Sequence, residues 1–460
     1  MLHKSSHPGI IIFLVFALIL IGFSFIIHAR TRTGVSIKSV KHPEWSRNAT
    51  IYEVNVRQYT TDGTFNAFAE HLPRLKKLGI DILWFMPVNP IGIQNRKGTL
   101  GSYYSVKDYK AVNPEFGTAG DFKNVVQKAH DLGMYVIIDW VANHTSWDNV
   151  WTENHPEFFT KDKKGNFVSP FDWSDVIDLN YDNKEVWNYM ADAMKFWVKE
   201  FDIDGFRCDV AAMVPLDYWK WVKPQLDSIK HVFMLAEAHE PELHEAFDMT
   251  YGWQLKDIFV DIAQGKKKAS ALFKLFETEK KTYPEDAYRM VFTTNHDENS
   301  WHGTDQERFG KYAEAFTVIT GLVNGMPLVY SGMENGLDKK LLFFEKDPIE
   351  WKESKYADIY SKLFALKKNN KALRNGIEGG ALKKIKLNDK NIFAFSREKE
   401  NDKVVAVFNL SAGKKKISFN KTKITGEFKN LFSDAVVTVD NKYELNIEPY
   451  SYIVLTRSAD

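Results

Sequence analysis

Short apolar runs alternate with amphipathic stretches through most of the chain. Residues 80–86 are apolar apart from Asp81, and Pro87 ends this run, which is typical of a buried parallel strand. Residues 65–78 and 121–132 have helical periodicity, and a glycine follows each of them. The other expected strands span residues 51–56, 135–138, 205–209, 232–236, 247–251, 290–293 and 328–330. The pattern predicts eight strand–helix units, the number that closes a (β/α)8 barrel.

Two segments depart from this alternation. Residues 145–182 are rich in Trp, Asp, Asn and Pro and lack a helical period, so we expect a small inserted domain after the third strand. From residue 376 onwards, short strands are expected at 392–397, 404–409, 415–419 and 443–456. The predicted fold class is α/β: a (β/α)8 TIM barrel at residues 45–144 and 183–375, the inserted domain, and a C-terminal antiparallel β-sandwich domain at 376–460.

The N-terminal segment has the pattern of a targeting or anchoring sequence. Residues 10–27 are an apolar stretch with no charged residue and one polar residue, Ser24, and Lys4 stands before it and Arg30 and Arg32 after it. The stretch is at the lower limit for spanning a bilayer and longer than most signal-peptide cores. A cleaved signal peptide and an uncleaved membrane anchor within residues 1–30 both stay open, and a buried helix is the weaker alternative. In the first two cases the globular part is exported, and is periplasmic, secreted or anchored at the cell envelope.

Composition narrows the range of partners. The chain has 61 basic and 60 acidic residues, a net charge of +1, so nothing favours nucleic acid as a ligand. Its single cysteine, Cys208, allows no intrachain disulfide and no zinc-ligand spacing, and we expect it to be a small buried side chain rather than a nucleophile. Aromatic residues make up 14% of the chain, which fits a large core first and sugar binding second.

Polar residues stand where four of the expected barrel strands stop. In such barrels the active site lies at the carboxyl ends of the strands. The four segments are residues 139–144, 205–209, 235–237 and 292–297. A carboxylate in these places is costly to bury unless it is paired or used in chemistry.

Three carboxylates at one rim suit the hydrolysis of a glycosidic bond. That reaction needs a carboxylic acid to protonate the leaving oxygen and a carboxylate beside the anomeric carbon. Arg207 lies two residues before Asp209, so both side chains point to the same face of a strand. A neighbouring cation keeps an aspartate ionised, and clustered anions raise the pKa of one carboxyl group, as a general acid requires.

The motifs resemble those of the α-amylase family of glycoside hydrolases over roughly residues 45–456. Residues 139–144 match the family pattern Asp-x-x-x-Asn-His, and residues 205–209 match Gly-x-Arg-x-Asp. Glu237 stands in the third motif, and residues 295–297, Asn-His-Asp, match the fourth. The resemblance implies a retaining hydrolase that cleaves α-1,4-glucosidic bonds in starch-like glucans or maltodextrins and requires no cofactor for its chemistry.

The resemblance also implies roles for individual residues. Asp209 would be the nucleophile, Glu237 the general acid/base, and Asp297 the residue that holds the sugar's 2- and 3-hydroxyls. The resemblance assigns substrate binding to four further residues: Tyr104, which would stack on the sugar, Arg207, which would orient Asp209, and His144 and His296, which would donate to sugar hydroxyls. A retaining mechanism predicts carboxyl groups about 5 Å apart.

The sequence departs from the family pattern in two places. Ala212 and Met213 stand where typical α-amylases have Lys-His, whose histidine supplies a backbone ligand to a structural calcium ion. The replacement weakens the expectation of calcium and leaves Asn143 as the candidate ligand. Ser105 stands where many exo-acting α-glucosidases of the family have aspartate, which favours endo action or short maltodextrins.

Two other functions remain open at this point. An α-glucosidase or an α-glucan transglycosylase would use the same residues, because the acceptor site decides between water and sugar. Amino-acid-transporter heavy chains resemble the family, carry one N-terminal span and are not enzymes, but they lack the three carboxylates in whole or in part. The complete set Asp209, Glu237 and Asp297 therefore predicts an enzyme. The sequence does not indicate the oligomeric state.

Overall fold

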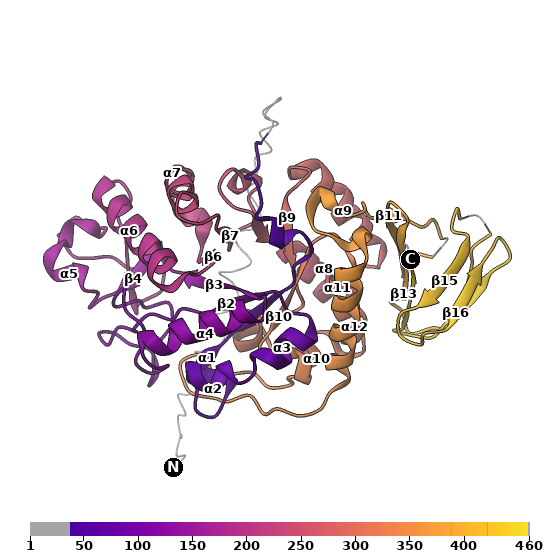
Figure 1. Ribbon diagram of the computed structural model, residues 1–460, viewed down its shortest axis with the longest axis horizontal. Coiled ribbons are helices and arrows are strands. Elements are labelled where there is room, and N and C mark those ends of the chain that lie inside the picture. The colour runs from indigo at the N-terminus through magenta and orange to yellow at the C-terminus, as the bar shows by residue number, and fades with distance from the viewer. Residues whose placement is uncertain (1–36, 388, 421, 459–460) are drawn as a thin grey trace, which may run out of the picture. The chain divides into compact units, whose positions relative to one another are not determined.

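A closed barrel of eight parallel strands forms the centre of the computed structural model, which describes residues 37–387, 389–420 and 422–458 (Figure 1). Its strands are β1 (Ile51–Val54), β2 (Ile82–Phe85), β3 (Tyr135–Trp140), β6 (Gly205–Cys208), β7 (Phe233–Ala236), β8 (Met249–Tyr251), β9 (Tyr288–Val291) and β10 (Met326–Tyr330). Ile51 of β1 lies opposite Ile82 on one side and Leu328 on the other, so the sheet closes on itself and has no free edge. The predicted (β/α)8 barrel is confirmed.

Alternating side chains along each strand build two separate cores. Ile82 and Trp84 point into the barrel, whereas Leu83 and Phe85 pack outward against helices. This period of two explains why the strands read as continuous apolar runs, since both faces of each strand are buried. The interior core ends where polar side chains replace apolar ones at the carboxyl ends of the strands.

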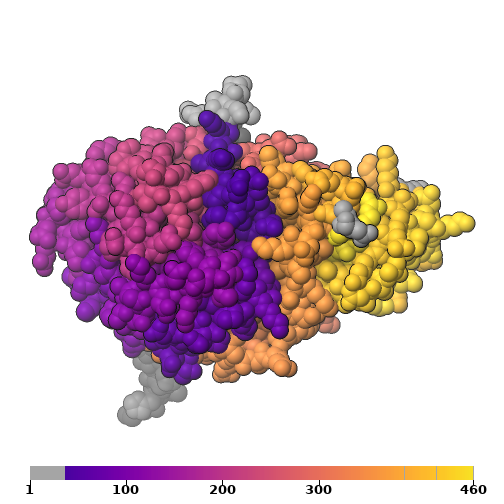
Figure 2. All heavy atoms as spheres, viewed as in Figure 1, coloured from indigo at the N-terminus to yellow at the C-terminus, as the bar shows by residue number. Residues whose placement is uncertain are grey.

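Helices surround the barrel and cover its strands on the face that Figure 2 shows. The helices are α1 (Val56–Tyr59), α2 (Phe65–Ala69), α3 (Leu72–Leu78), α4 (Ala119–Asp131), α5 (Trp151–Asn154), α6 (Lys184–Phe201), α7 (Leu216–Asp227), α8 (Trp253–Ala263), α9 (Ser270–Thr282), α10 (Asp305–Phe309), α11 (Ala313–Leu322) and α12 (Lys355–Asn369). The expectation of one continuous helix over residues 65–78 is wrong. Pro73 lies in the first turn of α3, where its missing N–H and fixed φ favour a new helix start.

The segment after β3 leaves the barrel and returns to it through a two-stranded antiparallel sheet. Its strands are β4 (His144–Ser146) and β5 (Val176–Asp178), with His144 opposite Asp178. This pairing fixes His144 directly beyond the carboxyl end of β3.

Antiparallel strands form the C-terminal part, as predicted. They are β11 (Lys383–Lys384), β12 (Ile392–Lys399), β13 (Asp402–Asn409), β14 (Lys415–Ser418), β15 (Gly426–Asn430), β16 (Val436–Val439), β17 (Glu444–Ile447) and β18 (Tyr452–Arg457). The expected single strand at residues 443–456 is wrong, because β17 pairs with β14 whereas β18 pairs with β13 and β15. Pro449 and Tyr450, the latter with φ of 55°, turn the chain between the two sheets.

The expected leader cannot be compared with the structure, since residues 1–30 with their apolar stretch 10–27 lie outside the described residues. Within the described ranges, no helix has both the length and the apolar character that crossing a membrane requires. The predicted domain boundaries near residues 145, 183 and 376 stay predictions.

Candidate active site

Strand alternation places a layer of polar side chains at the carboxyl end of the barrel. Ile51, Ile137 and Leu235 belong to the interior core, and the residue two positions after each of them is Glu53, Asp139 or Glu237. Arg207 of β6 points the same way, because its neighbours Phe206 and Cys208 pack outward in the core between barrel and helices. Cys208 is a buried free thiol on that outward face, away from the polar layer.

Arg207 is the centre of this layer and is fully buried. Its Nη1 donates to Asp139 Oδ1 at 2.8 Å and to Asp209 Oδ1 at 3.0 Å. Its Nη2 lies 2.8 Å from Glu237 Oε1, and its Nε donates to the hydroxyl of Tyr251 at 3.1 Å. One guanidinium therefore joins side chains of β3 and β8 to those that directly follow β6 and β7, and fixes their relative positions.

Burial and mutual repulsion favour a proton on the Asp209–Glu237 pair. Burial, followed by the charge of Glu237, raises the pKa of Asp209 well above its ordinary value. Burial also raises the pKa of Glu237, against the effect of Arg207. Because Arg207 faces both of these groups and Asp139, full ionisation would leave excess negative charge, and the two titration steps belong to the pair.

Asp297 is the last residue of the polar segment 292–297, which follows β9, and its side chain remains ionised. Its side chain is 40% exposed, and its Oδ2 lies 3.2 Å from Nε2 of His296. Burial would raise its pKa, but the charge of His296 outweighs burial and lowers it. Burial would lower the pKa of His296, but the charges of Asp297 and Glu53 outweigh burial and raise this pKa well above its usual range.

Glu53 is a site residue that the sequence analysis missed. It is fully buried on β1, and its Oε1 pairs with Nδ1 of His296. Burial raises the pKa of Glu53, whereas His296 lowers it. The sequence held one indication of this residue: Glu53 is the only acidic residue in the otherwise apolar strand 51–54. It lies on the same face of the strand as Ile51, which points into the barrel.

Tyr104 and His144 both border the carboxylates. The hydroxyl of Tyr104 lies 3.1 Å from Asp139 Oδ2 and 2.8 Å from His296 Nε2, and its ring stacks on His296 with centroids 5.5 Å apart. Nε2 of His144 is 3.8 Å from Asp209 Oδ2, which is beyond hydrogen-bond distance. Burial lowers the pKa of His144 to about 3, so its imidazole is neutral at pH 7.

Asn143, the candidate calcium ligand, has contacts within the protein. Its side-chain amide lies 3.3 Å from Nδ1 of His144, and its carbonyl accepts from the backbone N–H of Leu179 at 3.1 Å. Among the residues that the structure describes, no group of three or more His, Cys, Asp or Glu side chains is placed to hold a metal ion. The arrangement gives Asn143 a structural role, and its role as a calcium ligand stays a prediction.

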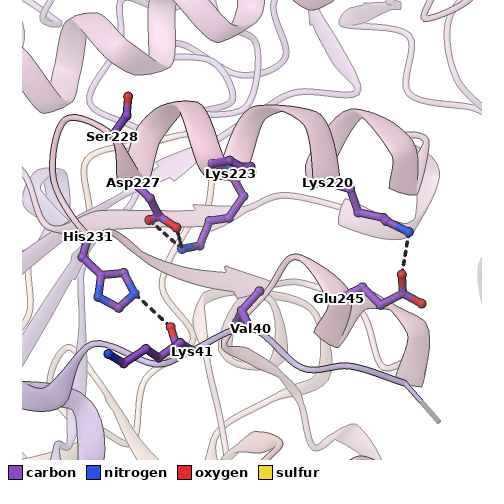
Figure 3. Close-up of a pocket in the computed structure, with 9 residues that line it drawn as sticks. Val40, Lys41, Lys220, Lys223, Asp227, Ser228, His231 and Glu245 are labelled. Carbon is purple, nitrogen blue, oxygen red and sulfur yellow. Dashed lines mark hydrogen bonds and ion pairs between the residues drawn. The ribbon is translucent and has the colours of Figure 1, made fainter.

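A cavity of 520 Å³ lies at the opposite end of β7 and does not have the chemistry of the carboxylate site (Figure 3). His231, one of its lining residues, lies two residues before β7 begins, whereas Glu237 directly follows the end of β7. Its two helix lysines are paired with carboxylates, Lys220 with Glu245 at 2.5 Å and Lys223 with Asp227 at 2.7 Å. The cavity therefore offers paired charges instead of carboxyl groups free to react.

A parallel barrel that gathers carboxylates at the carboxyl ends of β6, β7 and β9 defines a glycosidase-type active site. The family model for the α-amylase catalytic domain matches residues 46–175 and 156–380, which is more than half of the chain. The chain belongs to the α-amylase family, as its motifs predicted.

Solved structures and curated relatives agree with this assignment. An α-amylase from Lactobacillus plantarum is 32% identical and has a TM-score of 0.81, with 90% of this chain and 99% of that one covered. A noncanonic maltogenic α-amylase from Thermotoga neapolitana is 31% identical, with a TM-score of 0.82 and the same coverage. Alpha-amylase 2 of Dictyoglomus thermophilum is 26% identical over 70% of this chain, and the match spans 62% of that relative's own length.

Proposed function

We propose that the protein is a retaining glycoside hydrolase that cleaves α-1,4-glucosidic bonds in starch-like glucans or maltodextrins. The observation that carries this proposal is the contact of one guanidinium, Arg207, with both Asp209 and Glu237, at 3.0 and 2.8 Å. Two carboxyl groups held by the two terminal nitrogens of one guanidinium stand close together, which fits the short separation of a retaining mechanism.

In the first half of the reaction, Glu237 carries the proton. It donates this proton to the glycosidic oxygen, while an oxygen of Asp209 attacks the anomeric carbon and the bond to the leaving sugar breaks. The product is a covalent β-glycosyl ester on Asp209, and Glu237 is left as a carboxylate. Arg207 stabilises the ionised form of Asp209 before attack, since its Nη1 donates to the attacking carboxylate.

In the second half, water takes the place of the departed sugar. Glu237 removes a proton from this water, whose oxygen attacks the anomeric carbon and breaks the ester with Asp209. Glu237 is again protonated and Asp209 again ionised, and the released sugar has the α configuration of the substrate. Val210 donates its backbone N–H to Glu237 Oε2 at 2.8 Å, so Glu237 is held in place in both halves.

The two histidines and Tyr104 bind the sugar in different charge states. His296 is held protonated by Glu53 and Asp297 and presents a cation next to the sugar's hydroxyls. Neutral His144 accepts at Nδ1 from Asn143, which leaves its proton on Nε2 for donation to a hydroxyl. The ring of Tyr104 supplies the face on which the pyranose stacks, and Asp297 accepts hydroxyl hydrogen bonds with its exposed carboxylate.

A product profile on maltoheptaose, starch, pullulan and isomaltose tests this function. Wild type is expected to cut the α-1,4-linked substrates, and Asp209→Asn is expected to lose about 3 kcal/mol or more of transition-state stabilisation. Failure to cut any α-glucan, or near-full activity of Asp209→Asn, would rule the proposal out.

Transfer to a sugar acceptor is the alternative for the same residues. Alpha-1,4-glucan:maltose-1-phosphate maltosyltransferase of Picrophilus torridus is 28% identical over 45% of this chain, and trehalose synthase of a Pimelobacter strain is 32% identical over 37%. Products longer than the substrate at high maltoheptaose concentration would favour a transglycosylase, and products that are only shorter favour hydrolysis. Release of single glucose units from the chain end would favour an α-glucosidase.

Export and calcium complete the proposal. We place the globular part outside the cytoplasm on the basis of the apolar stretch 10–27 and its basic flanks.

The chemistry needs no cofactor, so calcium would act on stability alone, through Asn143. Unfolding followed with EDTA and with CaCl2 tests this role: a rise in Tm with CaCl2 that Asn143→Ala abolishes supports a calcium site, and an unchanged Tm excludes it.

A further inference from the structure

A large aromatic side chain projects from the polar segment that carries Asp297. Asp297 caps a single π-helical turn, η6 (Glu298–His302), and Trp301 of this turn is 51% exposed. Isolated π turns recur at functional sites because they displace side chains from the regular helical path. In this turn Trp301 lies beside Asp297. The indole N–H of Trp301 hydrogen-bonds to the Asp297 carboxylate, which lowers the pKa of Asp297.

Trp301 is the outer end of a row of rings that begins at the buried site. Phe343 lies between Trp301 and the buried rings. Its ring centroid is 6.3 Å from that of Tyr104, and the two ring planes are nearly parallel, at 16°. The centroid of Phe343 is also 6.3 Å from that of His296. On its other side, Phe343 is 5.3 Å from the ring of Trp301. Exposure rises along the row, from 8% at Tyr104 to 51% at Trp301. The row therefore leads from the catalytic carboxylates to solvent.

The two segments that carry these rings are fastened to each other. Asn299 of η6 donates to the carbonyl of Lys339 at 3.0 Å and accepts from the N–H of Leu341 at 2.9 Å. Gln58 donates to the carbonyls of Leu342 and Glu345, each at 2.9 Å, on either side of Phe343. The rings are thus held in place before any ligand binds, which limits the entropy that binding would cost.

We propose that Trp301, with Phe343, is a specificity-determining platform for the glucosyl unit next to the one held at the three carboxylates. Aromatic faces stack on the C–H face of a pyranose, and an exposed tryptophan beside a ring already in contact with the site offers such a face. The inference rests on the proposed function and adds to it a preference for substrates of more than one glucosyl unit.

The test compares substrates that do and do not reach the platform. For Trp301→Ala, we expect kcat/KM on maltopentaose to fall about tenfold or more, and kcat/KM on α-glucosyl fluoride, which has a single glucosyl unit, to fall about twofold or less. Trp301→Phe keeps a ring but not the N–H, and is expected to recover most of the preference for maltopentaose. Trp221→Ala, at a tryptophan of α7 that is 38% exposed, is the matched control and should change neither value.

Each outcome bears on one of the two proposals. Equal losses on both substrates, or no loss on either, would overturn the platform. A wild-type enzyme that cuts neither substrate contradicts the proposed function instead. In that case, binding of maltopentaose measured by tryptophan fluorescence still tests the platform: weaker binding by Trp301→Ala than by Trp221→Ala supports it, and equal binding overturns it.

Discussion

Charge pairing holds the buried site residues in their positions. Arg207 faces Asp139, Asp209 and Glu237, and His296 lies between Glu53 and Asp297. Two cations are thus paired with five carboxyl groups, so acidic groups outnumber basic groups in this layer. That excess allows one carboxyl group to carry a proton at neutral pH while another is ionised, which is what acid and nucleophile need.

Glu237→Gln tests the role of the proton at the residue scale. A glutamine cannot protonate the leaving sugar, so kcat/KM on maltoheptaose is expected to fall about 10²–10⁴-fold. The first turnover of α-glucosyl fluoride, whose fluoride leaves without a proton, should fall far less. Stopped-flow release of fluoride and sugar analysis measure the two reactions, and Glu242→Gln, at an exposed acid of η5 (Pro241–Glu245), is the control. Equal losses on both substrates would contradict the acid role.

Glu53→Gln tests the cause of the raised His296 pKa. Without Glu53, one of the two acids that contribute most to raising the pKa of His296 is lost, and that pKa should fall. His296 binds its proton more tightly in the folded chain, so the pair's contribution to the free energy of unfolding is fully present below about pH 6.5 and is lost as the pH rises through the raised pKa. Histidine ring NMR titration measures the shift, and His144, whose pKa burial lowers, is the internal control. An unchanged His296 pKa would be the contrary result.

At the scale of elements, strand ends explain how much of the site the sequence could predict. Asp139, Asp209 and Glu237 were found because each interrupts or follows an apolar run, and a parallel barrel brings all such ends to one rim. Glu53 was missed because β1 has four residues and gives too short a period to reveal its face. Trp301 was missed because a π turn has no signal in hydrophobic periodicity.

The contact between β6 and β7 gives a prediction about an element. A Cβ added to Gly205 would lie 1.9 Å from the carbonyl oxygen of Phe233, so Gly205→Ala must push the two strands apart. We expect a loss on the order of 3 kcal/mol in the free energy of unfolding and lower activity, because β6 carries Arg207. Denaturant unfolding measures the loss. Gly413→Ala, where an added Cβ meets nothing within 4 Å, is the control, and equal stability of both variants would refute the argument.

For the whole molecule, one buried arginine joins the C-terminal sheet to the barrel. Arg397 of β12 donates to the carbonyls of Leu322 and Val323 at the end of α11, at 3.1 and 2.8 Å. It also donates to the carbonyls of Arg374 and Gly380 in the connection between the two parts. Burial lowers its pKa to about 9. No sequence pattern predicted this contact, since an arginine in an alternating strand reads as a solvent-facing residue.

The leader gives a prediction for the whole molecule as well. If residues 10–27 direct export, the full-length chain should be recovered outside the cytoplasm, and a chain that begins at residue 37 should stay inside and keep its activity, because the barrel begins only at β1. Cell fractionation tests export, and the mass of the exported protein distinguishes a cleaved signal peptide from an uncleaved anchor. Equal distribution of both chains would contradict an export role for this segment.

The central claim is that Asp209 forms a covalent ester with the sugar. The most direct measurement is peptide mass mapping after reaction with 5-fluoro-α-glucosyl fluoride, which reacts with a retaining enzyme but slows the release of the sugar. The account predicts the mass of one fluoroglucosyl group on the peptide that contains Asp209, and no such mass in Asp209→Asn. A label on a different residue, or no label on an enzyme that cuts maltoheptaose, would contradict it.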